Sequence, residues 1–286
     1  MFPLLVRHTK LFFKDKANVF FSVLSVLIII LLYILFLAET ISANLTDLDE
    51  GESFTFLWMF AGVLAVTSAT TPLGALGKFI EDKVSKRDED LLMAPIKRST
   101  LIYSYIGYAF FIGCILTTLL FIFGYIYAYF SLGVKIDLSF FLMGVLFFSL
   151  LMHTLLFYLI VAQLPTMASF NGLSTIVGTL IGFLAGIYVP IGFLPAYIQK
   201  IIIAFPTTQA AVLLRNSFLD EILLSFQEVL PEDVYQALLS DLGVELYWNE
   251  TFLSSNFSWL YIFGLSACLI LIILFSNHIT LTHKGQ

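Results

Sequence analysis

The sequence has little charge and few cysteines. Asp, Glu, Lys and Arg make up 12% of its 286 residues, against about 25% in typical soluble domains. Hydrophobic residues make up 59%, and the mean hydropathy is +0.96. This composition excludes an ordinary soluble domain and predicts a chain that crosses a membrane several times. Cys114 and Cys268 both lie in apolar runs, so neither a disulfide framework nor a cysteine metal site is expected.

Two chemical signatures are also missing. The sequence contains no G-x-x-x-x-G-K-[ST] loop, and residues 74–79 have neither its spacing nor its hydroxyl, so any ATP and Mg must be bound by another chain. The cores of the apolar runs contain no Asp, Glu, Lys or Arg. Because ion-coupled transporters usually need carboxylates there, that class is not favoured. His153 is expected to be hydrogen-bonded structure rather than a proton relay, and no catalytic, cofactor or metal residues are predicted.

Six apolar runs are long enough to cross a bilayer, which takes roughly 20 residues. They cover about 19–38, 53–77, 101–130, 138–163, 171–189 and 257–277. The sequence therefore predicts an all-α polytopic membrane protein with one domain over 1–286. The first run is too long for a signal-peptide core, although Ile-Ser-Ala at 41–43 leaves cleavage as an alternative. Residues 1–18 carry four basic residues among spaced apolar ones, a pattern typical of an amphipathic interface helix.

The basic residues are distributed unequally between the two sides of the predicted membrane. The N-terminal segment, residues 77–100 and the C-terminal tail hold 11 of the 14 Lys and Arg residues, while the alternate loops hold 14 of the 20 acids. By the positive-inside rule, both termini and the 77–100 loop are predicted to be cytoplasmic, with the chain in the plasma membrane.

The 77–100 loop packs 11 charged residues into 24 positions. Lys86 lies four residues from both Asp82 and Asp90, which predicts a short helix, and Pro95 ends it. An apolar patch, Leu91-Leu92-Met93, interrupts the charge and suits the groove of another protein. The alternative is a merely solvated loop.

The second and fifth runs carry small and polar residues. Gly178, Gly182 and Gly186 recur every four residues, which predicts a ridge for close helix packing, either within one chain or at a dimer seam. Hydroxyl and amide side chains share these runs, and they either bond to their own backbone or face a cavity. The set is Thr67, Thr70, Thr71, Asn171, Thr175 and Thr179.

Residues 190–256 form an unusual outer region. Pro190, Pro195 and Pro206 interrupt its apolar first part, so a broken, partly re-entrant hairpin is expected instead of a continuous span. The following segment is acidic, with eight acids and no Lys or Arg between positions 220 and 250. Its function is left open by the sequence.

The charged loop resembles the loop after the second span of ABC type-2 exporter permeases. The resemblance rests on an acidic start, a mixed-charge helix, a Leu pair, then Pro and a basic pair, in EDKVSKRDEDLLMAPIKRS. It extends over nearly the whole chain except about 207–256, and includes the basic entry to the first span and an Arg after the Pro-marked helices, here Arg215. It implies a coupling helix that contacts a cytosolic ABC ATPase through Glu81, Asp82, Lys86, Asp90, Leu91, Leu92, Met93 and Pro95.

The resemblance also implies a homodimer whose second and fifth spans flank the central path. The predicted function is thus the permease subunit of an ATP-driven exporter for an amphipathic or hydrophobic substrate, such as a drug, a peptide antibiotic or a lipid. The chain is not expected to be an enzyme or to bind nucleic acid; its partners are the ATPase, a second permease and membrane lipid. The alternative is a non-transporting sensor or immunity protein that binds a ligand through its acidic outer segment.

Overall fold

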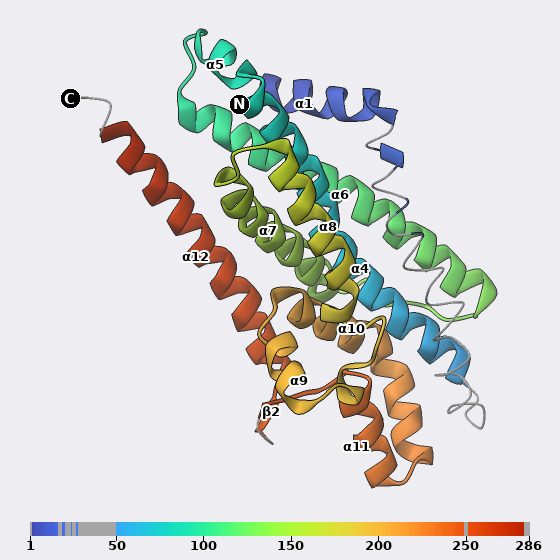
Figure 1. Cartoon of the computed structure of the whole chain (residues 1–286). Coiled ribbons are helices and arrows are strands. Elements are labelled where there is room, and N and C mark those ends of the chain that lie inside the picture. Colours follow the sequence, from blue (N-terminus) through green and yellow to red (C-terminus); the bar gives the residue numbers. More distant parts are fainter. Residues whose placement is uncertain are drawn as a thin grey trace.

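The computed structural model describes residues 2–16, 19–20, 24, 27, 50–248 and 251–282, with side chains up to residue 275. The described chain is a helical bundle with one small antiparallel hairpin (Figure 1). Its elements are α1 (Phe2–Lys14), α4 (Gly51–Val84), α5 (Arg87–Leu92), α6 (Arg98–Ser131), α7 (Phe140–Ala162), α8 (Met167–Leu184), η2 (Ile191–Phe193), α9 (Ala196–Ile203), α10 (Pro206–Val229), α11 (Glu232–Asp241), β1 (Leu246–Trp248), β2 (Thr251–Leu253) and α12 (Ser255–Thr282). The predicted first span at 19–38 and the C-terminal tail lie outside the described residues, apart from a few positions.

The described residues include five helices long and apolar enough to cross a membrane: α4, α6, α7, α8 and α12. A sixth is reached if α9 and α10, which bend by 86° at a short break, count as one span. The all-α polytopic fold is therefore confirmed.

Two predicted boundaries move for local reasons. The second span does not end at residue 77, because α4 continues helically through the charged sequence to Val84. The fifth span, predicted over 171–189, covers Met167–Leu184 instead. Thr166 caps its start, with its side chain accepting from the Ser169 backbone, and Gly186 adopts a φ of +65° just after its end.

Helix α4 is the centre of the bundle. It packs against α6, α7, α8 and α10, and 89% of its most apolar stretch is buried inside the chain, against 17% for α8. Its Ala61, Ala65 and Ala69 are fully buried, so small side chains let neighbouring helices approach closely. Phe60 stacks on Phe218 of α10 with ring centroids 5.6 Å apart. A helix that is apolar on all sides is expected in this position.

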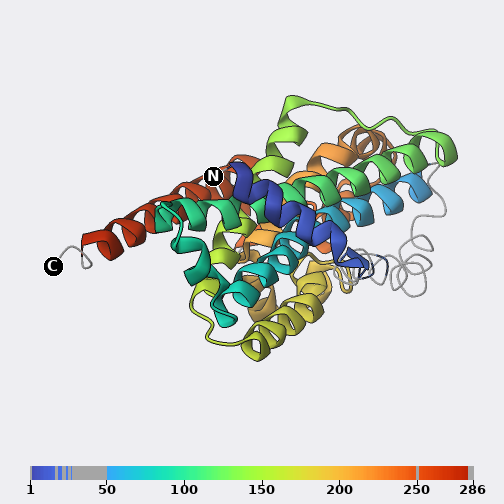
Figure 2. The ribbon, with the colours of Figure 1, turned by 90° about the horizontal axis from the view of Figure 1, so that it is seen from above.

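The two ends of the bundle differ. Helices α1 and α5 and the C-terminal end of α12 lie at one end, whereas α9, α11 and the hairpin lie at the other (Figure 1). Both views show α1 lying across the bundle rather than along it (Figure 2). The basic N-terminal helix and the charged loop are therefore on the same side.

The predicted break near Pro206 is present, and its backbone is satisfied by side chains. Thr208 Oγ1 donates to the carbonyls of Leu184 and Ile202, both at 2.6 Å, and Gln209 Nε2 donates to that of Ile203 at 2.6 Å. Such bonds let a non-helical turn exist among apolar helices, because they give these three carbonyls donors that the interrupted helix does not supply.

His153 is hydrogen-bonded on both ring nitrogens, as the sequence suggested. Its Nε2 lies 2.9 Å from Thr207 Oγ1, and its Nδ1 lies 3.2 Å from Ser68 Oγ. The imidazole thus joins the middle of α4 and α7 to the start of α10.

Candidate functional site

The predicted coupling helix is α5, a six-residue helix at one end of the bundle. Lys86 precedes it with a φ of 57° and turns the chain between α4 and α5. Because this turn separates the two helices, the expected placement of Lys86 and Asp82 on one helix is wrong, whereas Lys86 and Asp90 do lie four residues apart at the start and within α5, with the Asp90 backbone N–H donating to the Lys86 carbonyl at 3.3 Å. Instead, Arg87 Nη1 bonds to Glu81 Oε1 at 2.8 Å and fastens α5 to the end of α4.

The apolar patch is presented at the tip of this loop. Met93 is 89% exposed and Pro95 is also exposed, whereas Leu91 and Leu92 are half-buried. The exposed acids Glu89 and Asp90 stand beside it. The surface exposed to a partner is therefore the apolar Met93 side chain, named the Met93 knob here, with the acidic side chains of Glu89 and Asp90 beside it.

Asp82 is not on that surface, which corrects its predicted place among the contact residues. Its side chain is fully buried, and Tyr105 Oη donates to its Oδ2 at 2.8 Å. Lys78 Nζ lies 3.1 Å from its Oδ1, Arg87 Nη1 lies 3.8 Å from the same atom, and Arg7 Nη1 lies 4.0 Å from Oδ2. One carboxylate thus joins α1, α4, α6 and the start of α5.

Helix α1 packs beside this carboxylate through His8, which no sequence pattern singled out. The His8 ring is buried and lies 4.4 Å from the ring of Tyr105, and neither of its nitrogens has a hydrogen-bond partner in the described part of the chain. Burial, reinforced by the neighbouring Arg7 charge, lowers the pKa of His8 to about 4. The imidazole is therefore neutral at neutral pH and acts as an apolar wedge.

The three threonines of α4 bond to their own helix. Thr67 and Thr71 are buried and donate to the carbonyls of Val63 and Thr67 at 2.8 and 2.7 Å, and Thr70 donates to that of Val66 at 3.1 Å. Within one copy of the chain, Thr67 and Thr71 do not line an open path. This is the first of the two alternatives that the sequence allowed.

The polar residues of α8 are exposed. Asn171, Thr175 and Thr179 follow one another at four-residue spacing on one face, with Thr175 Oγ1 donating to the Asn171 carbonyl at 2.9 Å. Gly178 belongs to the same open face, since a Cβ added there would meet nothing within 4 Å. The hydroxyls of Thr175 and Thr179 donate to carbonyls of their own helix, which satisfies them without a partner.

The predicted glycine ridge is not continuous. A Cβ on Gly182 would collide with the ring of Tyr188, and one on Gly186 would lie 2.9 Å from Ile191 Cγ1. Gly186 also lies beyond the end of α8. Both glycines make room for the chain's own return segment, so of the three only Gly178 is available to a second copy.

The family model for the ABC-2 type transporter matches residues 2–219 of this chain. The chain belongs to that family. No curated protein and no solved structure gives a match. As an ABC-2 permease, the chain is a multi-pass membrane transport component without an ATPase site of its own, and such permeases typically work with an ATPase subunit. The match ends within α10, so α11, the hairpin and α12 lie beyond it.

At the end opposite α5, Arg215 of α10 contacts α4 and the segments that follow α8 and α11. It is fully buried, and its guanidinium lies 4.5 Å from the ring centroid of Trp58. Nη2 donates to the carbonyls of Ala185 at 2.9 Å and Gly186 at 3.3 Å, and Nη1 donates to that of Gly243 at 3.2 Å. These carbonyls follow the C-terminal ends of α8 and α11, where the helix dipole favours a cation. The sequence placed Arg215 after the broken hairpin, but gave no partner for it.

Trp58 completes the same contact from α4. Its Nε1 donates to the carbonyl of Leu242 at 2.7 Å, one residue before the Gly243 carbonyl that Arg215 binds. The acidic segment beyond the family match is therefore fixed to the centre of the bundle.

Proposed function

We propose that this permease is the membrane subunit of an ATP-driven exporter, a homodimer served by two copies of a cytosolic ABC ATPase. Its substrate is amphipathic or hydrophobic: a drug, a peptide antibiotic or a lipid. The termini and α5 face the cytoplasm, and α9, α11 and the hairpin face outward. The observation that carries the proposal is the buried Asp82 carboxylate, which links an exposed partner surface to the central helix.

The coupling argument starts at the Met93 knob. A force on α5 reaches α4 through the Arg87–Glu81 bond of 2.8 Å and through Asp82, and reaches α1 through Arg7. Because α4 is one helix from Gly51 to Val84, displacement of its charged end is transmitted into the bundle core. ATP-driven closure of two ATPases beneath the permease therefore has a direct mechanical route to the spans.

The transport path is proposed to form between two copies. The α8 face with Asn171, Thr175 and Thr179 is exposed in one copy, and a second copy facing it would enclose a polar-lined channel. Gly178 lies between these side chains and leaves room for close approach. The apolar surroundings suit cargo that enters from the membrane or its interface.

The coupling surface is tested by Met93→Asp. A charge at the apolar knob should reduce both recovery of an ABC ATPase with the tagged permease and ATP-dependent substrate movement in liposomes. The matched control is Val234→Asp, which makes the same kind of change at a 45% exposed position on α11, at the far end. Equal ATPase recovery and transport in Met93→Asp and the wild type would show that α5 is not the coupling surface.

Orientation is tested with single cysteines at Ser85 and Ser240 in a chain lacking Cys114 and Cys268. A membrane-impermeant thiol reagent applied to intact cells should label the Ser240 position only. Labelling of both positions would overturn the proposed topology.

The sensor alternative predicts a different pattern. It requires ligand binding confined to the acidic outer segment, with no ATP-dependent movement of any amphipathic cargo in the reconstituted system. That combination would replace the exporter proposal.

A further inference from the structure

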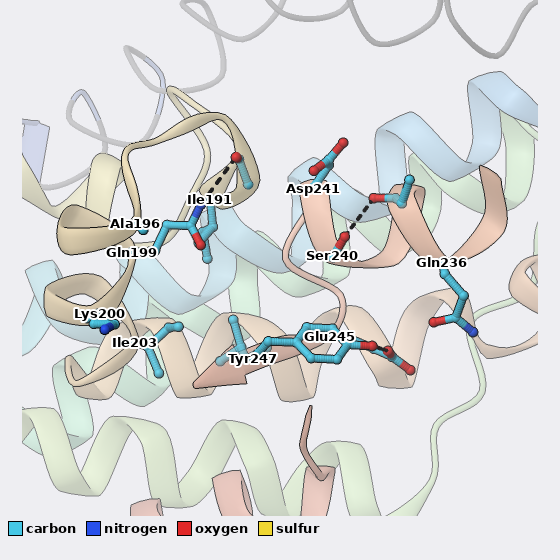
Figure 3. A pocket seen from close by; sticks show the side chains of 13 residues that line it. Ile191, Ala196, Gln199, Lys200, Ile203, Gln236, Ser240, Asp241, Glu245 and Tyr247 are labelled. Carbon is cyan, nitrogen blue, oxygen red and sulfur yellow. Dashed lines mark hydrogen bonds between the residues drawn. The ribbon is translucent and has the colours of Figure 1, made fainter. Parts of the chain in front are cut away.

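Two adjoining cavities lie at the end of the permease opposite α5. The first, of about 740 Å³, is lined by η2, α9, α11 and β1; it is named the polar chamber here because charged and amide side chains stand on its otherwise largely apolar wall (Figure 3). The second, of about 700 Å³, is lined by α7, α9, α12, the first residue of α10 and Trp248, and is almost entirely apolar. Lys200 of α9 lines both, so a polar chamber and an apolar groove meet at one cation.

The polar chamber contains charges of both signs. Lys200 stands on one wall, and Asp241 and Glu245 stand on the opposite side (Figure 3). Lys200 and Asp241 form no ion pair within the described residues, and Glu245 accepts a bond from Tyr247 Oη at 2.6 Å. A ligand that carries an anion and a cation a few bonds apart would satisfy both walls at once.

The apolar groove extends away from Lys200 along spanning helices. Ile201 and Phe205 form one wall, and Leu156, Ile160 and Leu265 come from the neighbouring α7 and α12. Among the residues that the structure describes, no acidic side chain lines it. Its composition matches a hydrocarbon chain and not a soluble ligand.

Aromatic residues with polar tips stand beside the groove. Trp248 is 41% exposed, and Tyr261 lies less than two turns into α12 with its Oη bonded to the Ala204 carbonyl at 2.7 Å. Trp and Tyr concentrate where the hydrocarbon core meets the headgroups. The groove mouth is thus placed at headgroup level, with the polar chamber on the aqueous side.

We propose that the two cavities together bind one membrane phospholipid with an ammonium headgroup, of the phosphatidylethanolamine type. Its phosphate pairs with Lys200, its ammonium with Asp241 and Glu245, and one acyl chain fills the groove. The proposal rests on this end of the permease meeting a bilayer surface. It needs neither the ATPase nor a particular cargo, so it stands or falls apart from the coupling argument.

Quenching of Trp248 fluorescence by lipids with brominated chains provides the measurement. The purified permease, with Trp58 and Trp259 kept, is mixed in detergent micelles with brominated phosphatidylethanolamine or brominated phosphatidylglycerol. Trp248→Phe identifies the part of the signal that comes from the groove. We expect half-maximal quenching at a several-fold lower mole fraction of the ethanolamine lipid.

Three variants separate the parts of the site. Lys200→Gln should lower the affinity for both lipids about tenfold, which is the effect of losing one charge-assisted hydrogen bond. Asp241→Asn combined with Glu245→Gln should remove the preference for ethanolamine while leaving the glycerol lipid unchanged. Lys135→Gln, an exposed cation outside both cavities, is the matched control and should change neither.

Two results would overturn the proposal. The first is equal binding of the two lipids by the wild type, with Lys200→Gln behaving as Lys135→Gln does. The second is full competition by glycerophosphoethanolamine, which has the headgroup but no chains and would show that the chamber takes a soluble ligand. Gel filtration and the Trp58 signal establish that each variant is folded, so loss of binding is not loss of structure.

Discussion

Replacing Arg215 with methionine tests whether the outer half of the permease is tied to α4 as described. Methionine keeps much of the length and apolar volume of the arginine stem, but it has no donors. The carbonyls of Ala185, Gly186 and Gly243 would lose their bonds to the guanidinium. These are backbone groups, so a substitution at residue 215 cannot remove them along with the arginine.

The magnitude follows from the bonds. A buried group left without a partner costs about 1–3 kcal/mol, and the 3.3 Å contact to Gly186 counts at the low end, so the loss is about 3–7 kcal/mol. Replacing a buried ion pair by apolar residues is often neutral, but that result applies when both partners are replaced. Arg215→Lys keeps the positive charge but lacks the several donors of the guanidinium, so it should lower the free energy of unfolding less than Arg215→Met does.

The assay is equilibrium unfolding of the purified permease in mixed micelles, followed by tryptophan fluorescence. Lys135→Met removes an exposed cation from the same end of the bundle and should change stability by less than about 0.5 kcal/mol. Trp58→Phe in a double-mutant cycle with Arg215→Met should give a coupling of roughly 0.5–2 kcal/mol. A loss below about 1 kcal/mol for Arg215→Met would refute the assignment, because the three carbonyls would then have other donors.

Two other predictions concern α1 and α8. The folded-state pKa of His8, about 4, lies below its usual 6.5. Unfolding free energy should therefore be unaffected above pH 6.5 and fall by up to about 3 kcal/mol as the pH drops from 6.5 towards 4, a slope that His8→Phe should abolish. Gly182→Leu should destabilise the single chain by roughly 1–3 kcal/mol through its collision with Tyr188. Gly178→Leu, on the open face, should leave chain stability unchanged but reduce dimer recovery and transport.

Local signals explain how much of the fold was predictable. Long apolar runs identified the spans, because the bilayer requires about 20 apolar residues whatever they pack against. Pro206 predicted the break before α10, since proline removes a helical donor. The dense charges predicted a short helix at the end of the second span, and α5 is found there.

Long-range packing explains what the sequence did not indicate. The sequence predicted that Asp82 lies in a solvated loop. Instead, α4 continues past residue 77, and the Asp82 carboxylate points inward, where it contacts Tyr105 and Arg7. Both partners are distant in sequence, so no local pattern announces them. Likewise, the spacing of Gly178 and Gly182 predicted close packing at both, but only Gly182 has a neighbour within the described residues, and that neighbour, Tyr188, depends on how the chain returns after α8.

Helix α4 connects the two ends whose contacts matter most. Trp58 and Asp82 are 24 residues apart along it, which is about 36 Å at 1.5 Å per residue. Pro72 lies between them and cannot donate to the carbonyl of Ser68, the residue whose side chain contacts His153. The missing bond lowers the resistance of α4 to bending at this level. A displacement of Asp82 should therefore first move the hydrogen-bonded series Ser68–His153–Thr207. Thr207 is at the start of α10, so the movement would pass to that helix, which carries Arg215 and leads to the outer segment.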